Sequence, residues 1–225
     1  MAKSERKIPV GDGRVSAIWQ APDDAKAALV LAHGAGAGMR HRFMATVAAG
    51  LEERGIATLR YQFPYMEAGR KSPGSPQPAI DAVRAAAGEA AQLVPDLPLF
   101  VGGKSYGGRM SSTAESEAHI AGIQGLVFFG FPLHPPGKPS IERGAHLAKI
   151  KVPMLFLQGT RDSFADNDLI AEVCAGLGKR AQLSRFEDAD HSFHVPKSAG
   201  MSDGEVMATM LDVVAGWIGK IAAAQ

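Results

Sequence analysis

The segment that most constrains the fold of this chain covers residues 99–110 and reads LFVGGKSYGGRM. An apolar run leads into four glycines that surround Lys104 and Ser105. A glycine-rich loop that ends in Lys-Ser can bind phosphate. The same letters contain G-x-S-x-G at residues 103–107, a pattern that places a nucleophilic serine at a sharp turn between a strand and a helix. The two interpretations predict different proteins.

The phosphate-binding interpretation fails at the first position of its pattern. In G-x-x-x-x-G-K-[ST], with Lys104 and Ser105 as the last two residues, the first glycine would be residue 98, which is Pro98. The serine turn requires small residues two positions before and two after the serine, so that strand and helix approach without Cβ clashes. Gly103 and Gly107 occupy those positions. The sequence therefore favours a nucleophilic serine.

Short apolar segments alternate with helical segments along the chain. Strands are predicted at residues 15–19, 28–32, 56–61, 97–102, 124–129, 153–157 and 181–186, and helices at 42–54, 79–93, 106–116, 164–177 and 206–221. Residues 63–78 are expected to be irregular. Apolar strands that alternate with helices indicate a mostly parallel sheet with helices on both faces. A chain of 225 residues can bury one sizeable core, so a single domain over residues 1–225 is expected.

The residues that could activate the serine also follow predicted strands, at the sheet edge where ligands bind. A serine hydroxyl needs a base, and the base needs an acid that orients it. His191 lies between the last strand and the closing helix, and His194 is its main rival. Asp162 follows the preceding strand. We therefore expect Ser105 as nucleophile, His191 as base and Asp162 as acid.

A serine nucleophile also requires two backbone N–H groups that hold the oxyanion. One is expected from Tyr106, the residue after the serine. The other is expected from the glycine-rich loop that begins at His33, directly after a buried strand. We assign this second donor to Ala35, with Gly36 as the alternative.

The substrate cleft is expected to be open, because residues 131–152 leave room for a short loop or one small helix and not for a lid domain. Residues close to strand ends are the candidates to line it: His33, Gly34, Phe63, Pro64, Phe131 and Pro132. Lys104 and Arg109 flank the turn and are interpreted as solvated charges, with attraction of an anionic acyl group as the alternative. Cys174 falls within an apolar helical pattern and is expected to be a packed side chain.

Composition restricts the classes of partner. With 24 Lys and Arg against 23 Asp and Glu, the chain has no charge excess that would favour nucleic acid or an anionic membrane. No apolar stretch reaches the ~18 residues of a membrane span, and the N-terminal residues do not resemble a signal peptide. The single cysteine favours a reducing compartment, so a cytoplasmic protein with a small-molecule substrate is expected. The histidines lack ligand spacing, and neither a metal nor another cofactor is expected.

Five stretches together resemble the small, lidless α/β-hydrolases related to dienelactone hydrolase. They are residues 31–37 (LAHGAGA), 60–65 (RYQFPY), 102–110 (GGKSYGGRM), 157–162 (LQGTRD) and 190–193 (DHSF). The resemblance covers nearly the whole chain and implies an α/β-hydrolase fold with Ser105, Asp162 and His191 as catalytic residues. Dienelactone hydrolases typically carry cysteine where this chain has Ser105, so their specific activity is not carried over.

The leading functional hypothesis is a serine hydrolase that cleaves a small-molecule ester or thioester through an acyl-enzyme. An amidase or peptidase would use the same residues. The chain is also similar to a hydrolase-like region in a subunit of a chromatin acetyltransferase complex, so a catalytically silent scaffold or binding protein is the alternative from another class.

Overall fold

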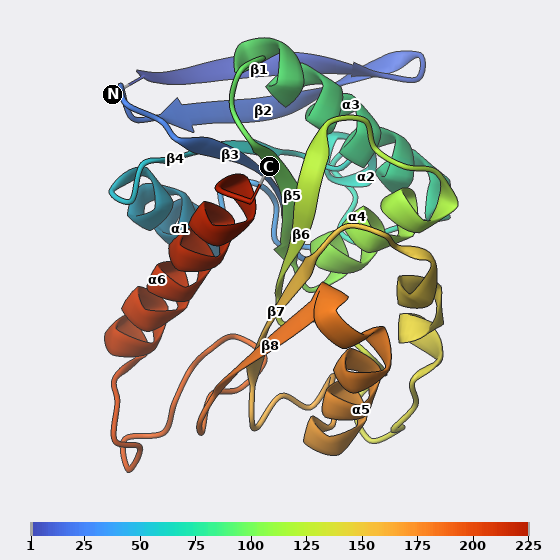
Figure 1. Ribbon diagram of the computed structural model, residues 1–225. Helices are drawn as coiled ribbons and strands as arrows, with labels where there is room; N and C mark the ends of the chain where they lie inside the picture. Colours follow the sequence, from blue (N-terminus) through green and yellow to red (C-terminus); the bar gives the residue numbers. More distant parts are fainter. Residues whose placement is uncertain (1, 225) are drawn as a thin grey trace.

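The strands of the computed structural model, which describes residues 2–224, form one sheet in the order β1-β2-β4-β3-β5-β6-β7-β8 (Figure 1). The strands are β1 (Ala2–Val10), β2 (Gly13–Ala21), β3 (Ala27–Ala32), β4 (Ile56–Tyr61), β5 (Leu99–Lys104), β6 (Ile123–Phe129), β7 (Met154–Gly159) and β8 (Ala181–Phe186). The pairs from β4 to β8 are parallel. The mostly parallel sheet expected from the sequence is confirmed.

An antiparallel hairpin begins the sheet, and only its second strand is expected from the sequence. β1 and β2 pair along their length and are joined by Gly11 and Asp12, with Gly11 at a φ of 54°. β1 escaped prediction because its residues are largely charged or polar and exposed, as expected of an edge strand. Ile8 is its deeply buried residue.

Helices cover both faces of the sheet, which explains why the central strands are apolar throughout. They are α1 (Arg42–Glu52), α2 (Pro64–Glu67), α3 (Gln77–Leu93), α4 (Tyr106–Glu117), α5 (Asn167–Leu177) and α6 (Asp203–Ala222), with 3-10 helices η1 (Glu142–Lys149) and η2 (Gly178–Arg180). α1 and α6 pack on one face, and α3, α4 and α5 on the other (Figure 1). Every residue of β3, β4 and β7 is buried between these layers.

Local signals set several helix boundaries. Asp166 precedes α5 and its carboxylate accepts hydrogen bonds from the N–H groups of Asp168 and Leu169. Ser202 and Glu205 form a capping box at the start of α6. Residues 63–78, expected to be irregular, instead contain α2 and the first residues of α3.

The connection between β6 and β7 contains only η1, so the expectation of a fold without a lid domain is confirmed. Cys174 is buried in α5, as expected, and burial raises the pKa of its thiol to about 12. In the part of the chain that the structure describes, none of the helices has the length and apolar character needed to cross a membrane.

Candidate active site

Ser105 lies at a strained turn between β5 and α4. Its φ of 50° and ψ of −115° fall in a region that L-residues rarely adopt and that is found mostly at functional sites. The close approach of α4 to β3 explains the glycines, since a Cβ on Gly107 would lie 2.5 Å from the carbonyl oxygen of Ala32. The turn therefore presents the serine side chain at the carboxyl edge of the sheet.

A continuous chain of hydrogen bonds links Ser105, His191 and Asp162. His191 Nε2 lies 2.8 Å from Ser105 Oγ, and His191 Nδ1 lies 2.7 Å from Asp162 Oδ2. The Asp162 carboxylate is fully buried, whereas the His191 side chain is 20% exposed. Donation of the Nδ1 proton to Asp162 leaves the Nε2 lone pair directed at the serine hydroxyl, so the ring can accept the hydroxyl proton.

The buried carboxylate of Asp162 is held by further hydrogen bonds. Its Oδ1 accepts from the Phe164 N–H at 2.8 Å, and its Oδ2 accepts from the Gln158 amide at 2.5 Å. Such donors stabilise a charge that is withdrawn from water. The rival histidine is placed differently: His194 is exposed, and its hydrogen bond with Asp203, 2.9 Å long, raises the pKa of the ring.

The two candidate N–H donors for an oxyanion lie beside Ser105. Tyr106 is the first residue of α4, and Ala35 lines the same cavity as Ser105. Within residues 2–224, neither N–H has a hydrogen-bond partner in the protein. The N–H of Gly36 donates to the Tyr65 hydroxyl at 3.2 Å. The geometry therefore favours Ala35 over Gly36.

A cavity of about 380 Å³ opens at Ser105 and His191. Its walls include Gly34, Ala35, His41, Phe43, Lys104 and Phe164. Sequence reasoning missed three of these: His41 and Phe43 at the start of α1, and Phe164 after β7. Phe164 lies over the base, with a ring-centroid distance of 4.4 Å to His191. Phe43 belongs to the periodic apolar pattern of its helix, which indicates packing and not a cavity wall.

Five of the six residues expected at the substrate cleft lie elsewhere. Gly34 lines the cavity, but His33, Phe63, Phe131 and Pro132 are buried, and the half-buried Pro64 lies outside the cavity wall. These rings pack against their neighbours. Phe63 contacts the rings of His33, Tyr61 and Tyr106, while Phe131 contacts Phe128 and Phe156. A residue after a strand end can therefore turn back into the core.

His33 is fully buried and held by backbone groups alone. Its Nδ1 donates to the Gly34 carbonyl at 2.7 Å, and its Nε2 accepts from the Phe63 N–H at 3.1 Å. Burial lowers the pKa of the ring to about 4. Both nitrogens are satisfied in the neutral form, so the ring fixes the loop that carries Ala35.

The environment of Lys104 differs from the solvated charge expected from the sequence. Its Nζ donates to the His191 carbonyl at 2.5 Å and lies 5.8 Å and 5.5 Å from the ring centroids of Phe43 and Phe193. Burial lowers the pKa of its ammonium group to about 8, against the opposing influence of Asp162 and Asp190. Arg109 is half-buried and lies 5.9 Å from the Tyr106 ring centroid.

No cluster of three or more His, Cys, Asp or Glu side chains suited to hold a metal ion occurs within residues 2–224. The groups that line up at the cavity are the hydroxyl, the imidazole, the carboxylate and the backbone donors described above. Together they suit the transfer of an acyl group from a substrate to the serine.

Comparison with known proteins shows the same fold. A family model described as an alpha/beta hydrolase domain matches residues 25–219. A lidless α/β serine hydrolase from Xanthomonas campestris has a TM-score of 0.75 at 19% identity, covering 96% of this chain and 95% of that chain. Dienelactone hydrolase from Anabaena variabilis has a TM-score of 0.76 at 18% identity, covering 97% of each chain. An esterase from Pyrococcus furiosus has a TM-score of 0.72 at 17% identity, covering 98% of this chain and 90% of that chain.

Proposed function

The chain belongs to the alpha/beta hydrolase family, and from that premise we propose that it is a serine hydrolase that cleaves a small-molecule ester or thioester. The observation that carries the proposal is the hydrogen-bonded series Ser105–His191–Asp162, with links of 2.8 Å and 2.7 Å, at the wall of a cavity. A strained serine, an aligned base and two unpaired backbone donors at one point are the parts that acyl transfer requires.

In the acylation step, Ser105 Oγ attacks the carbonyl carbon of the substrate while its proton passes to His191 Nε2. Asp162 stabilises the imidazolium that forms. The carbonyl oxygen becomes an oxyanion that accepts hydrogen bonds from the N–H groups of Tyr106 and Ala35. The bond to the leaving group then breaks, and His191 donates its proton to that group.

The deacylation step uses the same groups in reverse. His191 removes a proton from water, whose oxygen attacks the acyl carbon of the ester formed with Ser105. The oxyanion again accepts from Tyr106 and Ala35. Collapse of the intermediate releases a carboxylic acid, and the proton on His191 returns to Ser105.

An ester or thioester is preferred over an amide because alcohols and thiols are better leaving groups than amines. The similarity to an esterase and to dienelactone hydrolase agrees with this preference. An amidase or peptidase with the same residues remains the second candidate, and a catalytically silent scaffold the third. We expect the protein to act in the cytoplasm on a small molecule, as one domain without a cofactor.

The test is intact-mass analysis after exposure to a fluorophosphonate. We expect one adduct on the natural chain, mapped to Ser105 and absent from Ser105→Ala and His191→Ala. Ser112→Ala is the matched control, since it removes the other serine–histidine hydrogen bond of the described residues, 2.7 Å to His146, away from the cavity. A folded protein that forms no adduct would favour the scaffold. Hydrolysis of p-nitrophenyl acetate then separates turnover from labelling.

A further inference from the structure

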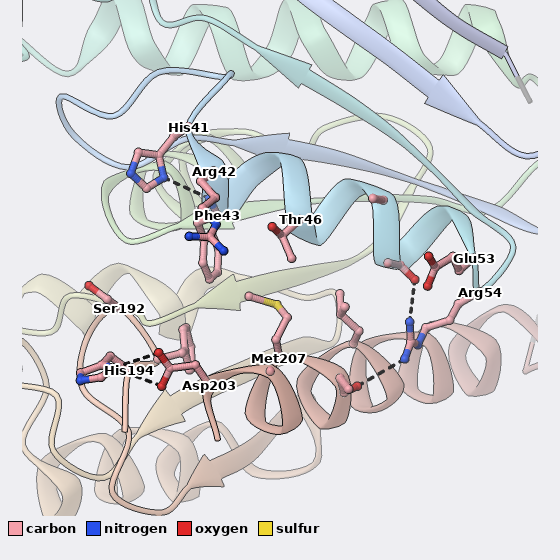
Figure 2. A pocket seen from close by; sticks show the side chains of 16 residues that line it. His41, Arg42, Phe43, Thr46, Glu53, Arg54, Ser192, His194, Asp203 and Met207 are labelled. Atoms are coloured by element: carbon pink, nitrogen blue, oxygen red, sulfur yellow. Dashed lines mark hydrogen bonds and ion pairs between the residues drawn. The ribbon is translucent and has the colours of Figure 1, made fainter. Parts of the chain in front are cut away.

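A larger hollow lies beside the cavity at Ser105, between α1 and α6 (Figure 2). Its volume is about 730 Å³, against about 380 Å³ for the cavity at the serine. His41, Phe43 and Ser192 line both hollows, so the two adjoin at these residues. The space between the two helices therefore begins at residues that also border the cavity at Ser105.

The hollow is a groove whose far end is bridged by one side chain. Its floor is the contact of α1 with α6, where a Cβ on Gly50 would overlap the side chain of Leu211. Arg54 crosses the far end and donates to the carbonyls of Gly50, at 2.8 Å, and Ala208, at 3.5 Å (Figure 2). At 1.5 Å of rise per helical residue, α1 from residue 42 to residue 52 spans about 15 Å.

The groove is apolar along its middle, and three of its ionic side chains are held in ion pairs. Phe43, Met207 and Leu211 line its length. Arg54 pairs with Asp212 at 2.8 Å, and His194 pairs with Asp203 at 2.9 Å. Arg42 and Glu53 are exposed at opposite ends of the groove. These walls suit an uncharged apolar group better than an ion.

We propose that this α1–α6 groove binds an apolar arm, an alkyl chain or aryl group, of the ester whose carbonyl lies at Ser105. The proposal rests on the proposed function. The occupant is part of the substrate because the groove shares three lining residues with the cavity at the serine, among them Ser192 next to the base, and Arg54 bridges α1 and α6 at its other end. Burial of one methylene contributes up to about fourfold in binding.

The experiment compares long and short esters in two series. One varies the acyl chain (p-nitrophenyl octanoate against acetate), and the other varies the alcohol (octyl acetate against methyl acetate). Thr46→Trp and Ala208→Trp fill the groove from α1 and α6. Ala45→Trp and Thr209→Trp are the matched controls, because both residues are exposed on the same helices but lie outside the groove wall.

In the natural chain and the controls, we expect kcat/KM for the long ester to exceed that for the short one roughly tenfold or more in one series. The filled variants should lose most of that ratio, and the series that responds identifies the arm. Equal ratios in all five proteins would refute the groove while leaving the proposed function intact. If the natural chain hydrolyses none of these esters, both the proposed function and the proposed role of the groove are refuted.

A second inference comes from Lys104, independently of the groove. Lys104 precedes the nucleophile, and its ammonium group holds the backbone carbonyl of the base at 2.5 Å. It thereby ties the end of β5 to the loop after β8. Gly130 leaves space for the ammonium group of Lys104, since a Cβ on residue 130 would lie 2.9 Å from Lys104 Nζ. The geometry points to Lys104 as a positioning residue that keeps His191 aligned with Ser105.

The test of Lys104 separates alignment from general stability. We expect Lys104→Met to lower kcat and the rate of fluorophosphonate labelling by the same factor, roughly 10- to 100-fold, with KM nearly unchanged. Lys104→Arg, which retains a donor, should recover part of both rates. Arg109→Met is the comparison, since it removes the other cation beside the turn. The assignment would be overturned if Lys104→Met kept the kcat of the natural chain. It would also be overturned if Lys104→Met and Lys104→Arg lost the same factor in kcat, or if Arg109→Met lost as much as Lys104→Met.

Discussion

The loops that follow β3 and β8 each carry a histidine at the carboxyl edge of the sheet, but the two rings meet different partners. His33 lies in the centre of the sheet between two backbone groups, the Gly34 carbonyl and the Phe63 N–H. His191 follows an edge strand and lies between a carboxylate and a hydroxyl. Burial and a donating backbone N–H on Nε2 keep the His33 ring neutral, whereas the hydroxyl and the carboxylate on either side of His191 allow that ring to accept and release a proton.

Replacement of His191 by glutamine should have the largest effect and tests the half of the comparison that concerns chemistry. Without a base, kcat for p-nitrophenyl acetate is expected to fall by roughly 10⁶. Because the ring is partly exposed, the thermal midpoint should change little. Retention of more than a hundredth of the natural kcat would show that another group acts as base.

Asp162→Asn should lower kcat by roughly 10⁴, because the amide can donate to Nδ1 and stabilise the wrong tautomer of His191. The change keeps the shape of the side chain in its buried site. Measurement of kcat beside the urea midpoint separates catalysis from folding. An unchanged kcat would mean that the carboxylate only supports the loop.

Ala35→Pro tests whether the loop of His33 contributes a backbone donor. Proline removes the N–H, so kcat is expected to fall about 10²- to 10³-fold, with KM changed much less. Fluorophosphonate should still label Ser105, but more slowly. A variant that is folded and fully active would assign the second oxyanion donor elsewhere.

The smallest expected effect is on the pH dependence of the free energy of unfolding, and it should arise from His33. Its pKa is about 4 in the folded chain, below roughly 6.5 for an unfolded histidine. Unfolding therefore takes up a proton between these values, so stability is fully present above pH ~6.5 and falls towards pH 4. The loss is about 1.4 kcal/mol per pH unit for each such proton.

Urea unfolding at pH 7, 6, 5 and 4 measures this slope in the natural chain and in His33→Gln. His146, whose pKa is also lowered to about 4 by burial, should contribute a similar slope in both proteins. The variant is therefore expected to retain about half of the pH dependence. Identical slopes in the two proteins would contradict the account of His33.

The proposed reacting groups could be proposed from the sequence because their signals are local. The pattern of glycines around Ser105 follows from the contact of α4 with β3, and the positions of Asp162 and His191 follow from strands that end just before them. In a parallel sheet, successive strand ends share one edge. This rule is why Ser105, Asp162 and His191, which are far apart in the chain, could be predicted to lie close together.

The walls of the site were predicted poorly because they depend on distant contacts. The partner of Lys104 lies 87 residues away, and no pattern near Lys104 indicates it. His33 and Phe131 follow strand ends as His191 does, yet their rings pack inwards against aromatic neighbours. β1 was missed because an exposed edge strand carries charged residues.

The position of β8 at the border of the sheet has a consequence for how the molecule fails under stress. β8 pairs with β7 alone, whereas β5, which leads to Ser105, is paired on both sides. Detachment of β8 would withdraw His191 and leave the nucleophile in place, at a lower cost than unfolding the whole chain. We therefore expect heating to abolish activity before the whole chain unfolds, and we expect the amide hydrogens of β8 to exchange with deuterium before those of β5.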